Sequence, residues 1–416
     1  MKYEIGNIDR YAIAANGTVM ENASFFSVVL KEDVDANRLQ NAVCEALKSH
    51  PLFKTRVVYK KQYYLETNDA PVTITHSNAA DRPKEFGKST NDYPWRLCYD
   101  GKDICFEWCH IITDGRGAMA FFTDVLNVYF GLPVESSADR SLALGYESLY
   151  DKKVKSFGQK KQEKGFSVKD FPIIKNGFKC QSHVLSVKTA DVLRVAKKND
   201  ATPVAIIVPL ICRAVRERIP SNVKNRNVSC GIAVDCRKPA KVDTAHNFVL
   251  VKTITYTDRF DALDLPTMST IYRAMLDLFV EKDNLVAACT DMIDQTDFLY
   301  RLRPLALQRF LMKIVAKAVK NSMQNVGFTY IGKVPFCKEL SEHVEKFGFR
   351  TWPDIGHCCV AAADFDGTLY LDFCENYRDK GVIPAFIEIC RGFGLDVKLE
   401  KEELFEQAAM KVNYEL

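Results

Sequence analysis

The sequence predicts an α/β protein built from two halves of related design. The stretch "FFSVVLKEDVDANRLQNAVCEALKSHPLFKTRVVY" opens with a β-rich run, continues with Leu39, Val43 and Leu47 at helical spacing, and returns to a β-rich run after "SHP". Later, "SHVLSVKTADVLRVAKKNDATPVAIIVPLICRAVRERI" reads as a strand, a short helix and a long apolar helix that begins at Thr-Pro. A further strand is predicted in "GTLYLDFCENY", and a helix at the end of the chain.

Three segments are expected along the chain. Residues 1–150 form an N-terminal half and residues 180–416 a C-terminal half. Residues 133–179 lose hydrophobic periodicity, and residues 151–179 carry nine lysines against three acidic residues, which is typical of a crossover between halves. A solvated linker is the simpler interpretation of these charges, and a basic patch that serves a phosphorylated donor is the alternative.

The composition is that of an ordinary globular protein. With 416 residues, 47% of them hydrophobic, the chain is long enough for two cores, and a net charge of +4 is too small to indicate a nucleic-acid partner. We expect a cytoplasmic protein, because the start lacks the apolar core of a signal peptide and no segment approaches the roughly 18 unbroken apolar residues of a membrane span. The 14 cysteines lie in strand-like and helix-like runs without a CxxC pair, which favours buried free thiols and no metal site.

The most informative stretch is "CHIITDGRGAMAFF", residues 109–122. Before it, Ile104, Phe106 and Trp108 alternate with more polar residues, so His110 is predicted at the end of a strand. After it, glycines precede apolar residues at helical spacing: Met119, Phe122, Leu126 and Tyr129. The pattern predicts a strand, a tight turn and a helix, and it lacks the HExxH of a zinc protease.

Two interpretations of His110 and Asp114 fit this spacing. A neutral imidazole, with an unperturbed pKa of roughly 6.5, can accept a proton near neutral pH if a second contact fixes the ring. Alternatively, Asp114 caps the following helix and His110 is a satisfied residue at a strand end. Spacing alone does not separate the two.

The string "HIITDG" resembles the HxxxDG signature of the superfamily of chloramphenicol acetyltransferase, plant BAHD acyltransferases, nonribosomal peptide condensation domains and microbial alcohol acetyltransferases. Other segments agree in the family's order: "ALKSHPLFKTRV", "DATPVAIIVPLICRAV", "GIAVDCRK" followed by "HNFV", "NVGFTYIGKVP" and "GTLYLDFCENY". The resemblance covers most of the chain from about residue 20 and is closest to the alcohol acetyltransferase branch. It makes the catalytic interpretation of His110 the preferred one.

The resemblance implies a fold and an activity. Two chloramphenicol acetyltransferase-like domains, each with a mixed sheet and covering helices, would meet along a central tunnel with His110 at its centre. An acyl group would move from a CoA thioester, acetyl-CoA or longer, to a hydroxyl or amine of a small-molecule or lipid-like acceptor, with His110 as general base. No bound cofactor is implied, and relatives are often monomers.

The resemblance also assigns roles to the residues around His110. Asp114 would be structural and would pair with Arg237 of "VDCRK"; the alternative for Arg237 is a surface charge paired with Asp235. Gly115 would make room for the turn.

The second half supplies the other candidates. Thr329 and Tyr330 are candidates to stabilise the oxyanion. Asn247 corresponds to the family's G-N step, which reads His246-Asn247 here.

The chain also departs from the family pattern. Cys109 stands where many relatives have a histidine, and the DFGWG loop of the plant enzymes is missing, which argues against the plant branch. Two other functions remain open. One is condensation between carrier-protein thioesters, and the other is a binding protein of the same fold that has lost activity; the intact "HIITDG" counts against the latter.

Overall fold

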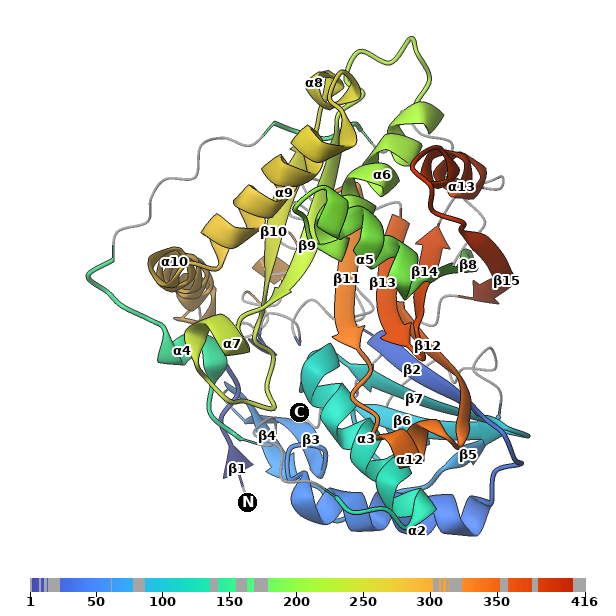
Figure 1. Cartoon of the computed structure of the whole chain (residues 1–416). Coiled ribbons are helices and arrows are strands. Elements are labelled where there is room, and N and C mark those ends of the chain that lie inside the picture. The colour runs from blue at the N-terminus through green and yellow to red at the C-terminus, as the bar shows by residue number, and fades with distance from the viewer. Residues whose placement is uncertain are drawn as a thin grey trace.

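The computed structural model has the mixed α/β architecture that the sequence predicts (Figure 1). It describes the chain except for residues 1, 7–8, 11–12, 14–22, 61, 78–86, 135–140, 155–162, 168–178, 302–306, 308–309, 312–313, 315–323, 352–357, 376–380 and 407–416. Most of the lysine-rich segment 151–179 therefore lies outside the described residues.

The first sheet has five strands in the order β12-β2-β7-β6-β5. Its strands are β2 (Ala23–Leu30), β5 (Thr75–His76), β6 (Trp95–Asp100), β7 (Asp103–Cys109) and β12 (Val344–Thr351). Two helices, α2 (Ala36–Ser49) and α3 (Gly115–Phe130), pack against each other and share a core with it. A smaller sheet, β1-β4-β3, consists of β1 (Lys2–Tyr3), β4 (Gln62–Thr67) and β3 (Thr55–Lys60).

The second sheet has seven strands in the order β10-β9-β11-β13-β14-β8-β15. They are β8 (Lys179–Lys188), β9 (Val228–Asp235), β10 (Val249–Tyr256), β11 (Val326–Lys333), β13 (Cys358–Phe365), β14 (Thr368–Glu375) and β15 (Lys398–Glu406). The β9, β11 and β13 strands run parallel and the other pairs antiparallel, so the sheet is mixed.

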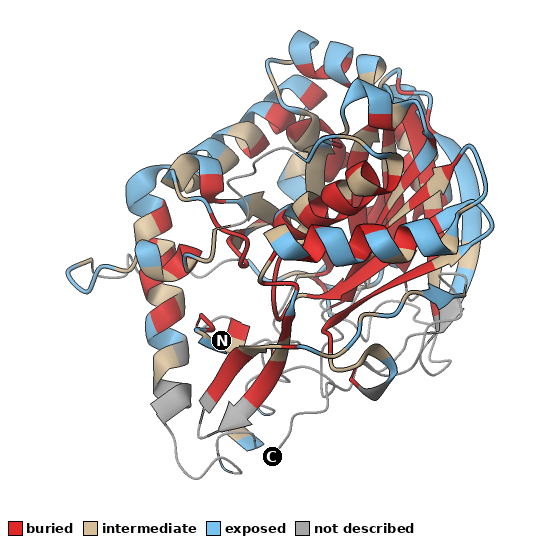
Figure 2. Cartoon of the chain, turned by 90° about the horizontal axis from the view of Figure 1, so that it is seen from below, coloured by how far each residue is buried: buried red, intermediate tan, exposed pale blue. Residues whose placement is uncertain are grey.

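The central helix of this half is α6 (Pro203–Arg218), which contacts α5 (Thr189–Lys198), α9 (Leu265–Phe279) and α13 (Ile383–Gly392). The Thr202 side chain caps α6 ahead of Pro203, as the Thr-Pro start predicts. The remaining elements are η1 (Lys88–Thr90), α4 (Gly145–Ser148), α7 (Arg237–Ala240), α8 (Asp258–Asp261), α10 (Lys282–Arg301) and α12 (Lys338–Ser341). Figure 2 shows that buried residues lie on the strands and on the inward faces of the helices.

Two units predicted from the sequence are confirmed. The first unit is β2, α2 and β3, and the second is β8, α5 and α6. The helix predicted at the end of the chain falls on residues 407–416, which lie outside the described residues; the last described element, residues 398–406, is β15 at the edge of the second sheet. Pairing with β8 overrides the helix propensity of its lysines and glutamates.

One strand joins the two halves. The β12 strand follows β11 in sequence but pairs antiparallel with β2 of the first sheet. Residues of β13, among them Ala361, Ala363 and Phe365, belong to the same core as the helices of the first sheet. The two halves of the chain are therefore connected by the backbone pairing of β12 with β2, and the two sheets by packed side chains.

A buried ion pair lies at this junction. Arg350 of β12 donates to Asp372 of β14 at 2.6 Å and to Glu403 of β15 at 3.1 Å. The side chains of Arg350 and Asp372 are 6% and 8% exposed. A strand of the first sheet is thus bound electrostatically to two strands of the second.

We expect Arg350→Met to lower the free energy of unfolding by about 3–5 kcal/mol, because it leaves the Asp372 carboxylate buried without its counter-charge. Urea denaturation measures the change. Arg273→Met is the matched control, since Arg273 pairs with Asp200 at the surface and its loss should cost under about 1 kcal/mol. Equal losses in the two variants would contradict the importance of the buried pair.

Candidate active site

His110 lies immediately after β7, in the turn that leads into α3. Its Nε2 atom is 3.2 Å from the Ser24 hydroxyl of β2, and its Nδ1 atom is 3.4 Å from the side-chain oxygen of Asn247. Burial lowers the pKa of His110, against the opposing influence of the Asp114 charge and of the Asn247 hydrogen bond. The imidazole is therefore neutral at neutral pH.

The contacts of Asn247 decide which nitrogen of His110 carries the proton. The Asn247 amide nitrogen donates to the His110 carbonyl at 2.6 Å and to Asp9 at 2.7 Å. Its side-chain oxygen must then face Nδ1, and an oxygen there accepts a hydrogen bond from Nδ1–H. This leaves the lone pair on Nε2, so the ring is held in the form that a general base needs.

Asp9, which holds Asn247, is itself fully inside the protein. Its residue is 2% exposed, and burial raises the pKa of its carboxyl well above the ordinary value, against the hydrogen bond from Asn247. The chain Asp9, Asn247, His110 links an N-terminal segment, the loop before β10 and the turn after β7.

Asp114 combines both roles that the sequence allows. Its carboxylate accepts from the backbone amides of Arg116 at 3.0 Å and Gly117 at 3.3 Å, which caps α3. It also accepts from the Arg237 guanidinium at 3.0 Å and from the Phe248 amide at 2.7 Å. These contacts fix the turn against the second half of the chain.

Arg237 is buried and is not a surface charge. It donates to the Thr244 carbonyl at 2.9 Å and to the His246 carbonyl at 2.8 Å, besides pairing with Asp114. It also pairs with Asp235 at 3.0 Å. Both partners considered from the sequence therefore bind it at once, and the loop that carries Asn247 is folded around the guanidinium.

The glycines after Asp114 differ in how tightly they are packed. Neither Gly115 nor Gly117 is among the residues with positive φ, so the turn needs no special backbone conformation. A Cβ on Gly117 would overlap the Thr113 hydroxyl and lie 2.5 Å from the Ala245 carbonyl, whereas one on Gly115 would meet its nearest neighbour at 3.5 Å. The close approach expected at Gly115 occurs at Gly117.

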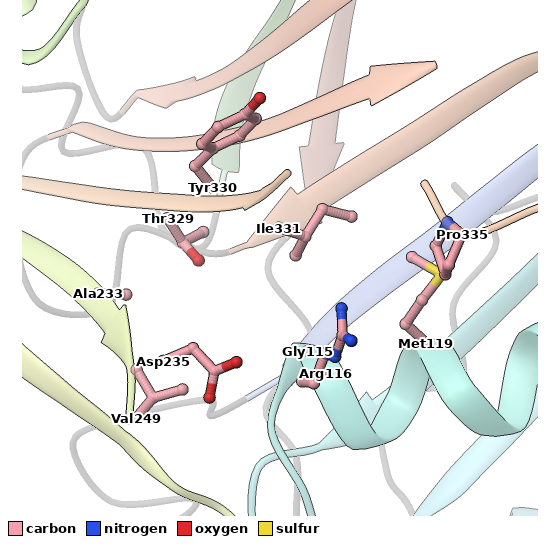
Figure 3. Close-up of a pocket in the computed structure, with 10 residues that line it drawn as sticks. All are labelled: Gly115, Arg116, Met119, Ala233, Asp235, Val249, Thr329, Tyr330, Ile331 and Pro335. Carbon is pink, nitrogen blue, oxygen red and sulfur yellow. The ribbon is translucent and has the colours of Figure 1, made fainter. Parts of the chain in front are cut away.

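A pocket open to solvent lies beside this turn (Figure 3). It is lined by Gly115, Arg116 and Met119 of α3 and by residues of β9, β10 and β11 with the segment that follows, namely Ala233, Asp235, Val249, Thr329, Tyr330, Ile331 and Pro335. The Thr329 hydroxyl points into the open space toward Asp235 and Gly115, and the Tyr330 hydroxyl points away from it. Thr329 is therefore the better placed of the two oxyanion candidates.

The sequence did not indicate Asp9, Ser24 or Thr351, although all three belong to the site. Ser24 and Thr351 are directly opposite each other on β2 and β12, with hydroxyl oxygens 3.2 Å apart. No local motif marks them, because their position depends on the pairing of strands more than 300 residues apart.

The described residues hold no group of three or more His, Cys, Asp and Glu side chains that could bind a metal ion. All fourteen cysteines are free, and eleven are buried. In the part of the chain that is described, every helix is too short or too polar to cross a bilayer.

No protein-family model and no curated protein sequence matches the chain. Solved structures match it over nearly its whole length. The trichothecene 15-O-acetyltransferase TRI3 from Fusarium sporotrichioides has a TM-score of 0.64 and 10% identity, and the match covers 94% of both chains. The chain has the fold of the chloramphenicol acetyltransferase and condensation-domain superfamily.

Two further structures show how widely this fold is used. TRI101 of F. sporotrichioides, solved with coenzyme A and T-2, matches with a TM-score of 0.63 and 10% identity over 96% of this chain and 99% of that one. The epimerization domain from the third module of tyrocidine synthetase B matches with a TM-score of 0.59 and 12% identity over 94% and 95%. At these identities the likeness establishes the fold that the sequence predicts.

We expect Asp114→Asn to lower the free energy of unfolding by about 3–5 kcal/mol, because it removes the counter-charge of buried Arg237 and places an N–H where an acceptor is needed. Urea denaturation measures this. The control Asp235→Asn makes the same carboxylate-to-amide change at a side chain that also pairs with Arg237 but is 44% exposed. It should lower the free energy of unfolding by under about 1 kcal/mol. In a double-mutant cycle, Asp114→Asn and Arg237→Leu should be non-additive by about 1 kcal/mol or more, and additivity would contradict the pairing.

A second prediction concerns pH. Burial lowers the pKa of His246 to about 4, and unfolded histidine titrates near 6.5. Between pH 4 and pH 6.5, His246 is protonated in the unfolded chain but not in the folded one. The stability that is present above pH 6.5 is therefore lost as the pH falls toward 4. His246→Gln should remove about 2 kcal/mol of the stability decrease between pH 7 and pH 5.

Urea denaturation at the two pH values tests this. The control His76→Gln replaces an exposed histidine, 70% exposed, and should leave the pH dependence unchanged. An equal decrease in His246→Gln and in the unmodified protein would show that His246 does not contribute.

Proposed function

We propose that the chain is an acyltransferase that moves an acyl group from a CoA thioester to a hydroxyl or amine of a small-molecule or lipid-like acceptor. The observation that carries the proposal is the state of His110: a neutral, partly buried imidazole whose Nδ1–H is engaged by Asn247 and whose Nε2 carries the lone pair, beside the Ser24 hydroxyl. A base held in this way suits removal of a proton from an acceptor, and Gly115 and Arg116, which follow in the same turn, line an open pocket.

The reaction needs no covalent intermediate on the enzyme. His110 Nε2 takes the proton of the acceptor O–H or N–H as the oxygen or nitrogen attacks the thioester carbonyl carbon. The tetrahedral intermediate collapses, the C–S bond breaks, and Nε2–H returns the proton to the thiolate. The low pKa of His110 favours return of that proton.

Other residues would support these steps. The Thr329 hydroxyl, which points into the pocket, is the candidate donor to the oxyanion, where loss of one donor costs roughly a hundredfold or more in rate. Asp114 and Arg237 would hold the turn, and Asn247 the tautomer.

The proposal also names the acyl donor and the location of the protein in the cell. TRI101, which shares the fold, was solved with coenzyme A, and this supports a CoA thioester as the donor. We place the protein in the cytoplasm, since its many buried free thiols suit a reducing compartment, and we expect a monomer only because the resembled family's members are often monomers.

A second candidate donor is an acyl group on a carrier protein. The likeness in fold to the epimerization domain of a peptide synthetase favours it. The third candidate, a binding protein without activity, is disfavoured because nothing in the fold itself requires a histidine at position 110.

Thiol release from acetyl-CoA and longer acyl-CoAs, measured over a panel of alcohols and amines, tests the proposal. We expect acceptor-dependent release that His110→Ala lowers by roughly a hundredfold or more. His76→Ala, at an exposed histidine, is the matched control and should retain full activity.

If no acyl-CoA and acceptor pair gives thiol release with the unmodified protein, the CoA donor is rejected. An acyl group loaded on a carrier protein is then the donor to test. Equal release by the unmodified protein and by His110→Ala would reject His110 as the base.

A further inference from the structure

The Ser24 hydroxyl shares a sheet face with the catalytic imidazole. In the first sheet, Ser24 of β2 lies opposite Trp108 of β7 on one side and opposite Thr351 of β12 on the other. His110 comes two residues after Trp108, one residue past the end of β7, and its Nε2 atom lies 3.2 Å from the Ser24 hydroxyl. Strand register therefore directs the Ser24 side chain to the imidazole, and Ser24 is 1% exposed.

Two acceptors compete for the single proton of this hydroxyl. The Ser24 oxygen is 3.2 Å from His110 Nε2 and 3.2 Å from the Thr351 hydroxyl oxygen. When the hydroxyl donates to Nε2, it occupies the lone pair that the acceptor substrate needs. When it turns to Thr351, it presents its own lone pair to Nε2.

We propose that Ser24, supported by Thr351, is a positioning residue for His110 whose hydroxyl donates to the neutral imidazole and, turned toward Thr351, accepts from the imidazolium. The role in catalysis rests on the proposed function. In the resting protein Ser24 satisfies Nε2, and an acceptor O–H displaces it. After proton transfer, Nε2–H donates to the Ser24 oxygen until the proton passes to the leaving thiolate.

The need for such a partner follows from the burial of His110. A buried imidazolium is costly, and burial is the main reason that the pKa of His110 is low. Other groups stabilise the charged ring from its other side: the Asp114 carboxylate, the Asn247 oxygen with Asp9 behind it, and the Thr113 backbone.

The remaining charge and ring at the site do not reach Nε2. The Arg237 charge is engaged by Asp114 and Asp235, and the Trp108 ring packs at 6.1 Å between ring centres. Within the described residues, Ser24 is the group that hydrogen-bonds Nε2.

The proposal predicts a direction for the titration of His110. A hydrogen bond to a charged group is stronger than one to a neutral group, so Ser24 stabilises the imidazolium more than the neutral ring. Ser24→Ala should lower the pKa of His110 by about half a pH unit or more. Thr351→Val should shift it the same way by less, and the double variant should match Ser24→Ala alone, because Thr351 acts through Ser24.

The first measurement is an NMR titration of the protein labelled with ¹³C at histidine Cε1, with the His110 signal assigned by its absence in His110→Ala. The control Ser27→Ala makes the same change on the same strand but on the opposite sheet face, and should leave the titration unchanged. If the His110 midpoint in Ser24→Ala is unchanged or rises, the proposal is overturned.

The titration uses no substrate, so it decides the role of Ser24 separately from the proposed function. Where acyl transfer is found, Ser24→Ala should lower kcat about tenfold. The acidic limb of its pH profile should move to lower pH by the same amount as the NMR midpoint. Thr351→Ser should retain activity. A Ser24→Ala enzyme with unchanged kcat and pH profile would overturn the catalytic role. Absence of any transfer in the unmodified protein would reject the proposed function and leave the titration result standing.

Discussion

The Asp114 carboxylate is the contact on which the rest of the site depends. It ends the turn after β7 and begins α3, while its other hydrogen bonds come from Arg237 and Phe248 of the second half. Arg237 in turn binds the carbonyls of the loop that carries Asn247. One buried carboxylate therefore sets the position of His110 and the position of the residue that selects its tautomer.

Local sequence was sufficient to predict the elements that depend on hydrophobic periodicity or on helix caps. The alternation around Trp108 placed His110 at a strand end, and the helix after Asp114 followed from its apolar spacing. The Thr-Pro start of α6 was equally clear. The last described strand, β15, was not predicted, because its lysines and glutamates do not favour a strand and only pairing with β8 makes it one.

The site was predictable only in part, for a related reason. His110, Asp114 and Arg237 belong to motifs with a spacing of their own. Ser24 and Thr351 are ordinary strand residues, and only register brings them to the imidazole. The hydroxyls of Thr329 and Tyr330 looked equivalent in sequence, and the alternation of β11 turned them to opposite sides.

The path of β12 has a consequence for how the chain reaches this structure. During synthesis, β2 is complete by residue 30, but the strand that covers its outer edge ends at residue 351. Until then β2 is an open sheet edge, which pairs readily with any other extended segment. The N-terminal half thus emerges from the ribosome with its motif intact and its sheet unfinished, and a delay in adding β12 exposes the nascent chain to mispairing.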